Sequence, residues 1–560
     1  MKKFIFFLAL IFFLGTVLRF YQLGRVPVEL NRDEASLGYT AYALLQTGRE
    51  EHGVPWPINI ESFVDWKLPG YVYTLIPFIK VFGLKPWVVR LPSALAGSLI
   101  ILLTGLITLS LSKNKKLSLL SALLVAISPW GIHLSHLAYE ANLAMFFFLI
   151  GLICFIVGES LKGGPRKIGE SNFWGLLFVF FWGLTLFTYH SYQIFTPLML
   201  FALSFFYKKR FLSLLAIFFI LILLFTSISA NQTKYASLSI LAKKTYSAQI
   251  NQERSYFQSQ KLAALYSNYP EKFLNQVQRN IANLFSARFF FFEGGAHGSH
   301  DIAGTGKMYP IEFIFLSSTA IYLLAKIKPA CRQAGSKKLE TYEKLILYWL
   351  LAASVAPLIT LDSAHSIRFS PALPALSFLS AYGLSHLSLL FPSPIHRRGI
   401  KGEVVLSVIS IILLYSTLNF LITYFVVAPQ RDLNNWNWQI KTLTQLIKDK
   451  KNNFDHVIMP GNTWSPYIYF LFYWKYDPQL IAQNVHYQEL TNEGFKHVKQ
   501  LENIYFSKRE DLRGHNLFVM KEQEINWDTL EKIKSGVYQL EYLLSNPNAK
   551  DVWYFYSYDR

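Results

Sequence analysis

Two adjacent acidic residues, Asp33 and Glu34, follow shortly after a long apolar run near the N-terminus. They stand in the segment ELNRDEASLGYTAY, which begins at residue 29. A carboxylate at a membrane surface is able to take a proton from a hydroxyl group or to bind sugar hydroxyls. The alternative is structural: Asn31 or Asp33 caps a helix that begins at Ala35, with acids in its first turn.

Two cations, Lys67 and Arg90, are expected in the same external layer as this acidic pair. Asp65 and Trp66 directly precede Lys67 and add an acid and an aromatic surface. Lysine and arginine side chains bind phosphate oxygens, and arginine does so with two parallel hydrogen bonds. Carboxylates, cations and aromatic rings grouped at one membrane face therefore indicate an anionic, sugar-bearing lipid as the ligand.

A third acid, Glu140, lies in the segment HLSHLAYEANLAMFFF between two further apolar runs. We expect it on the same side of the membrane as Asp33 and Glu34. The alternative is again a carboxylate at a helix N-terminus, where backbone N–H groups satisfy it. An ionisable residue at the end of a span is costly only if it is buried.

The segment LDSAHSIRFSPALPAL, residues 361–376, supplies the last candidates, Asp362, His365 and Arg368. Arg368 is a lone cation in a short external loop that otherwise lacks Lys and Arg. Because this runs against the usual charge distribution of membrane proteins, Arg368 needs a partner. A phosphate suits the guanidinium group, and an ion pair with Asp362 is the alternative.

Apolar runs that approach the roughly 20 residues needed to cross the hydrocarbon layer must position these side chains. They recur throughout residues 1–427, which we predict to be an α-helical polytopic membrane domain with about eleven transmembrane helices. The runs lie near residues 3–20, 88–111, 117–134, 141–158, 173–190, 194–207, 211–230, 309–327, 345–361, 370–391 and 404–427.

Basic residues alternate along the loops and predict the orientation of the chain in the cytoplasmic membrane. Every second connection is rich in Lys and Arg, from the N-terminal MKK through SKNKK, LKGGPRK, YKKR and KIKPACRQAGSKK to IHRRGIKG. This places the N-terminus in the cytoplasm and the loop of residues 21–87 outside. We read residues 68–83 as an interfacial helix within that loop, and the first run as a retained anchor.

The net charge of +19, from 54 basic and 35 acidic residues, does not indicate nucleic acid. Residues 428–560 are nearly neutral, so the excess lies in the membrane half, where the alternation of basic loops explains it. The two cysteines, Cys154 and Cys331, predict neither a disulfide framework nor a metal-thiolate site.

Two stretches are expected outside the membrane layer. Residues 231–308 form a polar external loop, helical in part. Residues 428–560 are predicted to form an extracytoplasmic α/β domain, with an amphipathic helix over LNNWNWQIKTLTQLIKDK and short strands at FDHVIMP, HNLFVMK and VWYFYSY.

Three segments in this order resemble bacterial relatives of protein O-mannosyltransferases and lipid A aminoarabinose transferases, which are GT-C glycosyltransferases. They are NRDEASLGYTAYALLQTGRE, DWKLPGYVYTLIPFIKVFGLKPWVVRLPSALAG and SPWGIHLSHLAYEANLAMFF, and the resemblance returns at DSAHSIRFSPALPAL. It implies a GT-C fold and Asp33 as the catalytic base. The family's lysine before a proline corresponds to Lys67, although Leu68 intervenes here. Glu140 stands where relatives often have Asp.

The resemblance implies inverting transfer of a sugar from a polyprenyl-phosphate donor to a hydroxyl of a lipid, glycan or protein. Glu34 or Glu140 would then hold sugar or acceptor hydroxyls. The predicted phosphate-binding residues are Lys67, Arg90, Arg368 and His365. No dedicated metal cage is recognised and no cofactor is expected to be required, although a divalent cation is not excluded.

Two other functions remain open from the sequence. An oligosaccharyltransferase would move a whole glycan to protein and usually needs a divalent cation at its acids. A transporter or lipid-binding protein without catalysis would place ionisable residues deep in its spans, along a pathway. The candidate charges of this chain are instead predicted to collect at one face, which favours the transferase.

Overall fold

The computed structural model describes residues 1–63, 65–160, 168–207, 220, 239–241, 244–295, 298–327, 338–387, 402–437, 439–459, 461, 465–488, 497–506, 511–546, 548 and 552–559. Most of the predicted span 211–230 lies outside this set, as do Cys331, Trp438 and Trp464. The described chain forms two compact units. The first contains Met1–Tyr21 and Ser93–Ile422, and the second contains Gln22–Pro92 and Thr423–Arg560.

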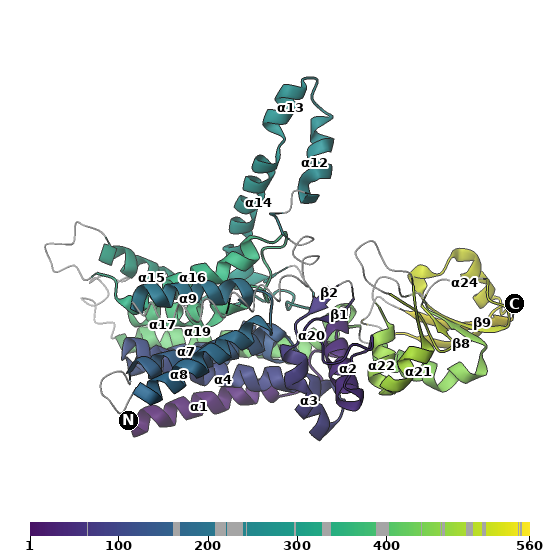
Figure 1. The fold of residues 1–560 in the computed structure, drawn as a ribbon, viewed down its shortest axis with the longest axis horizontal. Helices are drawn as coiled ribbons and strands as arrows, with labels where there is room; N and C mark the ends of the chain where they lie inside the picture. The colour runs from purple at the N-terminus through teal and green to yellow at the C-terminus, as the bar shows by residue number, and fades with distance from the viewer. Residues whose placement is uncertain are drawn as a thin grey trace. The chain divides into compact units, whose positions relative to one another are not determined.

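The first unit is helical (Figure 1). Its elements are α1 (Lys2–Phe20), α4 (Pro86–Ser112, from Ser93 onward), α5 (Lys115–Ile127), α6 (Pro129–Ser135), α7 (Glu140–Ser160), α8 (Ile168–Leu186), α9 (Tyr192–Tyr207), α12 (Lys244–Arg254), α13 (Gln260–Tyr266), α14 (Tyr269–Leu284), a π-helical turn (Arg288–Phe292), α15 (Glu312–Ile327), α16 (Thr341–Leu358), a 3₁₀ turn (Ser370–Ala372), α17 (Leu373–Ser385) and α19 (Gly402–Ile422).

Four helices among the described residues are long and apolar enough to cross a membrane: α1, α4, α7 and the stretch Val404–Arg431. The pair α5 and α6, bent by 57°, makes a fifth if it is one span. Several other predicted runs also contain helices, but these helices are shorter than a membrane-spanning helix usually is. The helices α9 and α15 have 16 residues each, and α17 has 13. The chain is a multi-pass membrane protein, and the eleven predicted spans are not confirmed in number.

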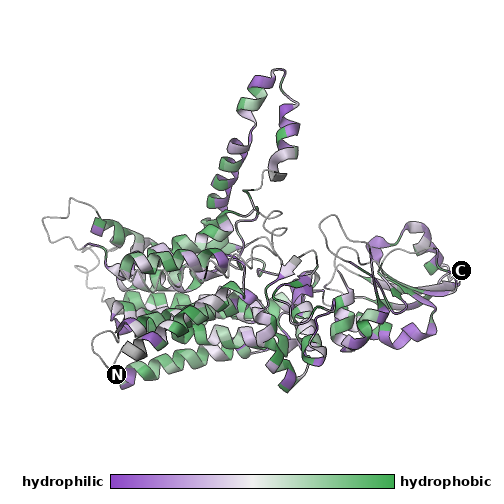
Figure 2. Cartoon of the chain, viewed as in Figure 1, coloured by the Kyte–Doolittle hydropathy of each residue, from purple (hydrophilic) through white to green (hydrophobic). Residues whose placement is uncertain are grey.

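Aromatic side chains pack α7 against α8, as their sequence predicts for part of their surface. Gly151 permits the close approach, since a Cβ there would lie 2.4 Å from the Trp182 ring. Trp182 is fully buried and stacks on Phe148, with ring centroids 4.8 Å apart. Phe180, on the opposite face of α8, is exposed. Figure 2 shows hydrophobic residues along most of these bundle helices.

The described part of residues 231–308 is helical in part, as predicted. The helices α12, α13 and α14 form a polar arm (Figures 1 and 2). Lys272 of α14 pairs with Glu253 of α12 at 2.5 Å, and Arg254 donates to the Ser267 carbonyl at 2.9 Å. These contacts hold the arm's two sides together where few apolar side chains are buried.

The second unit joins the loop that follows α1 to the C-terminal segment. The loop contributes α2 (Arg32–Thr47), the antiparallel hairpin of β1 (Ile60–Ser62) and β2 (Asp65–Lys67), and α3 (Gly70–Phe82). The predicted helix of residues 68–83 is thus present as α3. Tyr71 of α3 donates to the Val89 carbonyl at 2.8 Å, which fixes α3 to the first turns of α4.

The C-terminal segment is the predicted α/β structure. Its seven-stranded sheet has the order β4-β5-β6-β3-β7-β9-β8, with β3 parallel to β6 and β7 and the other pairs antiparallel. All three predicted strands are present, as β3, β7 and β9. The elements are α20 (Ala428–Arg431), α21 (Ile440–Lys450), β3 (His456–Ile458), α22 (Tyr467–Trp474), α23 (Ile481–Asn484), β4 (Val485–Tyr487), β5 (Val498–Leu501), β6 (Ile504–Tyr505), β7 (His515–Lys521), α24 (Trp527–Lys534), β8 (Gln539–Leu544) and β9 (Trp553–Asp559).

The apolar helix α22 packs on α2 and brings the C-terminal segment to the acidic pair's helix. A Cβ at Gly38 would lie 2.7 Å from the Phe472 ring, so only glycine permits this approach. The Tyr39 hydroxyl donates to the Tyr476 carbonyl at 3.0 Å. The position of α2 therefore depends on side chains more than 400 residues away in sequence.

Candidate active site

The helix α2 begins with a capping box. The Asn31 side chain accepts from the Glu34 backbone N–H at 2.9 Å, and the Glu34 carboxylate accepts from the Asn31 N–H at 3.1 Å. Two N–H groups that lack helical partners are thereby satisfied. The cap is Asn31, one of the two residues that the sequence offered. The helix begins at Arg32, three residues before the expected start at Ala35.

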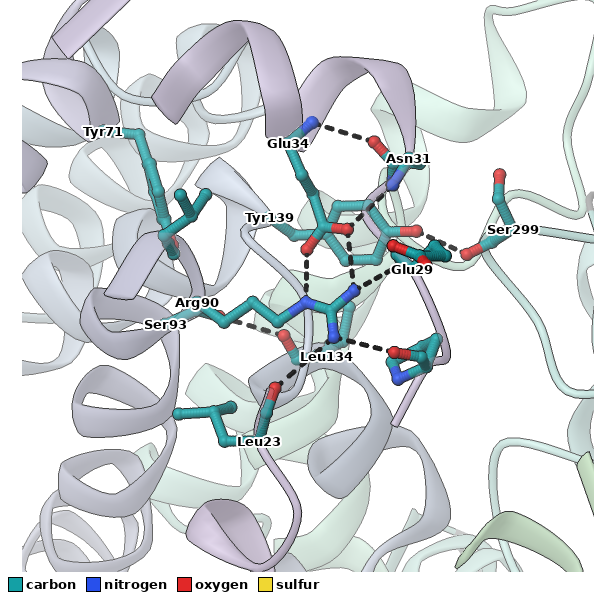
Figure 3. A network of polar contacts seen from close by, with 12 residues as sticks. Leu23, Glu29, Asn31, Glu34, Tyr71, Arg90, Ser93, Leu134, Tyr139 and Ser299 are labelled. Carbon is teal, nitrogen blue, oxygen red and sulfur yellow. Dashed lines mark hydrogen bonds and ion pairs between the residues drawn. The ribbon is translucent and has the colours of Figure 1, made fainter. Parts of the chain in front are cut away.

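Glu34 and Arg90 form a buried, bidentate ion pair (Figure 3). Arg90 Nε donates to Glu34 Oε1 at 2.9 Å and Nη2 donates to Oε2 at 3.1 Å. Both side chains are 1% exposed. Removing either partner would leave a buried charge unpaired, which is strongly unfavourable.

Arg90 uses all five of its N–H donors within the second unit. Besides Glu34, it donates to the carbonyls of Leu23 at 3.4 Å, Pro27 at 2.9 Å and Glu29 at 2.8 Å (Figure 3). An arginine in this state has no donor left for a phosphate. Through these contacts, Glu34 and Arg90 fix the loop that precedes α2.

Asp33, the adjacent acid, has the opposite environment. Its side chain is 56% exposed, and its Oδ1 pairs with Lys67 Nζ at 3.1 Å. Lys67 also donates to the Asp33 carbonyl at 3.3 Å, while its own side chain is only 6% exposed. The hairpin holds Lys67 in place, because Lys67 faces Ile60 across the two strands.

An accessible carboxylate beside a buried ammonium group suits both proton transfer and anion binding. Asp33 reaches solvent and is able to meet a hydroxyl group. Lys67 brings a positive charge that is largely shielded from water. Because water screens it little there, the charge acts more strongly on a nearby anion. The capped helix and the Arg90 network hold this pair in one orientation.

In the first unit, Glu140 opens α7 and is half-buried. The neighbouring Tyr139 hydroxyl donates to the Ser299 carbonyl at 2.6 Å, and its ring contacts His300 at 5.6 Å between centroids. His300 in turn lies 4.8 Å from the His365 ring. The structure therefore places one predicted phosphate-binding residue, His365, close to the start of α7.

Arg368 belongs to the same loop as His365 and is half-buried. Its Nη1 donates to Thr360 Oγ1 and to the Asp362 carbonyl, both at 3.2 Å, and its backbone N–H donates to His365 Nδ1 at 3.4 Å. Among the described residues, no hydrogen bond is found for its Nε and Nη2 groups. Arg368 thus differs from Arg90 in having donors left for an anion.

A buried ion pair that the sequence did not reveal supports this loop. Asp301 pairs with Lys307 and accepts from the Ser366 hydroxyl; the two charged side chains are each 4% exposed. Burial favours the neutral acid, but Lys307 and Ser366 outweigh it and hold the pKa of Asp301 below its usual value. The loop of residues 298–308 is thereby fastened to residues 362–368.

The seven predicted site residues thus fall into two groups. Asp33, Glu34, Lys67 and Arg90 lie together in the second unit, whereas Glu140, His365 and Arg368 lie in the first. Within the described chain, no three His, Cys, Asp or Glu side chains are grouped so as to hold a metal ion.

Several polar groups in loops have partners that the sequence does not reveal. His52 is paired with Glu50 at 2.9 Å in the second unit, and His300 packs against His365 in the first. Burial raises the pKa of Glu29 and of Glu51 to about 7. These residues stand in polar loops, so hydropathy gave no signal of their burial.

Residues 9–231 match the model of the family described as dolichyl-phosphate-mannose-protein mannosyltransferase. All the predicted site residues up to Glu140 fall within this match, whereas His365 and Arg368 lie beyond it. The match confirms the resemblance that the sequence suggested over about two fifths of the chain, and it indicates a membrane glycosyltransferase. No curated protein matches the chain.

Among solved structures, the chain is similar to ArnT from Cupriavidus metallidurans bound to undecaprenyl phosphate. The TM-score is 0.50 and the identity 12%, over 98% of this chain and 97% of that one. It is also similar to the archaeal oligosaccharyltransferase AglB from Archaeoglobus fulgidus, in complex with an inhibitory peptide and a dolichol-phosphate. That TM-score is 0.48 and the identity 13%, over 84% of this chain and 63% of the AglB chain. The likeness to ArnT shows a shared fold.

Proposed function

We propose that this chain, whose residues 9–231 match a family of membrane glycosyltransferases, moves a sugar from a polyprenyl-phosphate donor to a hydroxyl acceptor with inversion. The observation that carries the proposal is the ion pair of exposed Asp33 and buried Lys67 within the matched segment. It joins a proton acceptor to a cation, the two groups that transfer from a sugar phosphate requires.

Asp33 is the general base in this reaction. An acceptor hydroxyl oxygen attacks the anomeric carbon, the bond from that carbon to the phosphate oxygen breaks, and its electron pair leaves with the polyprenyl phosphate. The hydroxyl proton passes to the Asp33 carboxylate, which must lie within hydrogen-bonding distance, about 2.6–3.2 Å, of the attacking oxygen. Its exposed side chain suits this contact.

Lys67, Arg368 and His365 are the proposed phosphate-binding residues. The leaving phosphate gains negative charge in the transition state, and fixed cations stabilise that charge without needing to reorganise. Arg368 suits phosphate binding better than Arg90 does, because every N–H donor of Arg90 already binds Glu34 or a loop carbonyl. A phosphate flanked by cations leaves without a protonating acid.

Glu34 and Arg90 act through Asp33 as positioning residues in this proposal. Their ion pair fixes the first turn of α2, from which Asp33 projects. Glu140 is assigned to sugar or acceptor hydroxyls, a role that its half-buried position at the start of α7 permits.

The donor class is supported by the shared fold with ArnT, whose crystal structure holds undecaprenyl phosphate. The acceptor is a hydroxyl of a lipid, a glycan or a protein, and the reaction takes place on the outer face of the cytoplasmic membrane. The C-terminal segment packs on α2 and so takes part in shaping the site. No metal is required by this scheme.

Transfer assays with the purified full-length chain test the proposal. A labelled undecaprenyl-phosphate sugar should be consumed, with release of undecaprenyl phosphate, whereas a nucleotide sugar alone should not react. Asp33→Asn protein provides the matched inactive control. Turnover of a nucleotide sugar by the wild-type chain and not by the variant would overturn the donor assignment. Added chelator should leave the rate unchanged.

A further inference from the structure

Glu51 is a buried acid close to the proposed site that the reaction scheme does not use. It follows α2 in the segment TGREEHG and is 3% exposed. The adjacent Glu50 is already satisfied, because its carboxylate accepts from His52 Nδ1 at 2.9 Å and from the Val54 N–H at 3.1 Å. The hydrogen-bond partners of Glu51 must therefore be other groups than those that bind Glu50.

The contacts of Glu51 are incomplete for an ionised carboxylate. Its Oε1 accepts from the Tyr467 hydroxyl of α22 at 3.3 Å. Its Oε2 is buried and has no hydrogen-bond partner among the described residues. An ionised oxygen in this state would be costly, whereas a protonated carboxyl group is tolerated far better.

The charges around Glu51 agree with this picture. Burial and the neighbouring Glu50 raise the pKa of Glu51, and His52, Lys67 and the Tyr467 hydroxyl lower it; the net value is about 7. His52 itself is cationic, because Glu50 and Glu51 raise its pKa to about 9 against the effect of burial. Tyr39, Tyr487 and Glu61 are further titratable groups of the cluster.

Lys67 connects this cluster to Asp33. Its Nζ lies 3.1 Å from Asp33 Oδ1 and 5.6 Å from the centre of the Phe63 ring. The Phe63 ring contacts Tyr467, the partner of Glu51, at 5.9 Å between centroids. Lys67 also lowers the pKa of Glu51, so Asp33 and Glu51 both interact electrostatically with this one buried ammonium group.

We propose that Glu51 is a positioning residue that tunes the charge of Lys67 available to the donor phosphate. This rests on the proposed function. With Glu51 neutral, Asp33 alone balances the Lys67 charge. When Glu51 ionises, two carboxylates share that charge, and the phosphate meets a weaker positive field. Donor affinity therefore falls as the pH rises through 7. Tyr467 links this behaviour to the C-terminal segment.

The size of the change in donor affinity follows from the negative charge that Glu51 gains when it ionises. If the donor phosphate binds about 10 Å from Glu51, a unit charge on Glu51 changes its binding by roughly tenfold at an effective dielectric constant of about 20. The Glu51→Gln side chain keeps the shape of the protonated form and cannot ionise. It should therefore hold the donor-binding constant at its low-pH value across the range.

The experiment measures binding of undecaprenyl phosphate to the full-length chain in detergent from pH 6 to pH 8.5. The wild type should lose roughly tenfold more affinity than Glu51→Gln between these limits. Tyr467→Phe removes a hydrogen bond that lowers the pKa of Glu51, so its transition should move to higher pH. Glu61→Gln, the same substitution on a neighbouring acid, should follow the wild-type curve.

Two outcomes separate this inference from the function on which it rests. If the folded wild-type chain does not bind undecaprenyl phosphate at any pH, the donor assignment fails. If the wild type binds it but the folded Glu51→Gln protein shows the same pH curve, only the role of Glu51 is refuted. Ionisation of the lipid phosphate affects both proteins equally and cancels in the comparison.

Discussion

The adjacent acids Asp33 and Glu34 should respond to amide substitution in opposite ways. Glu34→Gln removes one charge from an ion pair whose two side chains are each 1% exposed. We expect this change to lower the free energy of unfolding. Asp33→Asn removes the counter-charge of Lys67, but the side chain is 56% exposed and its amide oxygen is still able to accept from Lys67, so it should cost much less stability and lower turnover instead.

The magnitude follows from the contacts of the Glu34 carboxylate. Oε1 accepts from Arg90 Nε, and Oε2 accepts from both Arg90 Nη2 and the Asn31 N–H. In either orientation, a glutamine amide places its NH₂ group against an N–H donor. Arg90 is left as a buried cation without a counter-charge, which costs about 3–5 kcal/mol.

Denaturant unfolding of the full-length chain in detergent micelles gives the stability difference, and circular dichroism at low denaturant checks that each variant folds. Glu34→Gln should lose about 3–5 kcal/mol, whereas Asp33→Asn, which weakens a partly exposed ion pair, should lose at most about 1 kcal/mol. Equal stability losses in the two variants, or none in Glu34→Gln, would refute the division of roles between the acids.

Three further outcomes are expected. Arg368→Ala should weaken binding of undecaprenyl phosphate by roughly 10- to 150-fold, since a charge-assisted hydrogen bond contributes about 1.5–3 kcal/mol; unchanged binding by titration would exclude Arg368 from the phosphate site. Asp301 has a lowered pKa, so the stability that it contributes is present above pH 3.8 and is lost as the pH falls below that value. Acid unfolding curves of Asp301→Asn should lack this loss. Cysteines placed at residues 113–116 should resist an impermeant thiol reagent in intact cells, whereas cysteines at residues 260–284 should react; labelling of the former would reverse the topology.

The elements of the candidate site were largely predictable, because they rest on local signals. Asn31 and Glu34 have the spacing of a capping box, and α2 begins there. Hydropathy predicted α1, α4 and α7, and alternation of apolar residues predicted β7 and β9. Spans built from shorter helices, such as α17, were less predictable, because burial inside the bundle leaves little constraint on their length.

The partners of the charged residues were not predictable from spacing. Arg90 and Lys67 were both predicted as cations of the same external layer, yet in the folded chain all donors of Arg90 bind Glu34 and backbone carbonyls. Glu51 stood in a polar loop and was buried by Tyr467, which lies 416 residues further along the chain. Such contacts depend on which distant segment covers a loop, and composition does not carry that information.

The central claim is that Asp33 takes the acceptor proton while Lys67 faces the donor phosphate. Single-turnover transfer from a saturating undecaprenyl-phosphate sugar tests it most directly, with donor binding titrated on the same protein. Asp33→Asn should bind the donor at least as tightly as the wild type, because it removes a negative charge beside Lys67, and should transfer the sugar about 10²- to 10⁴-fold more slowly. A folded, donor-bound Asp33→Asn protein that transferred sugar at the wild-type rate would contradict the claim.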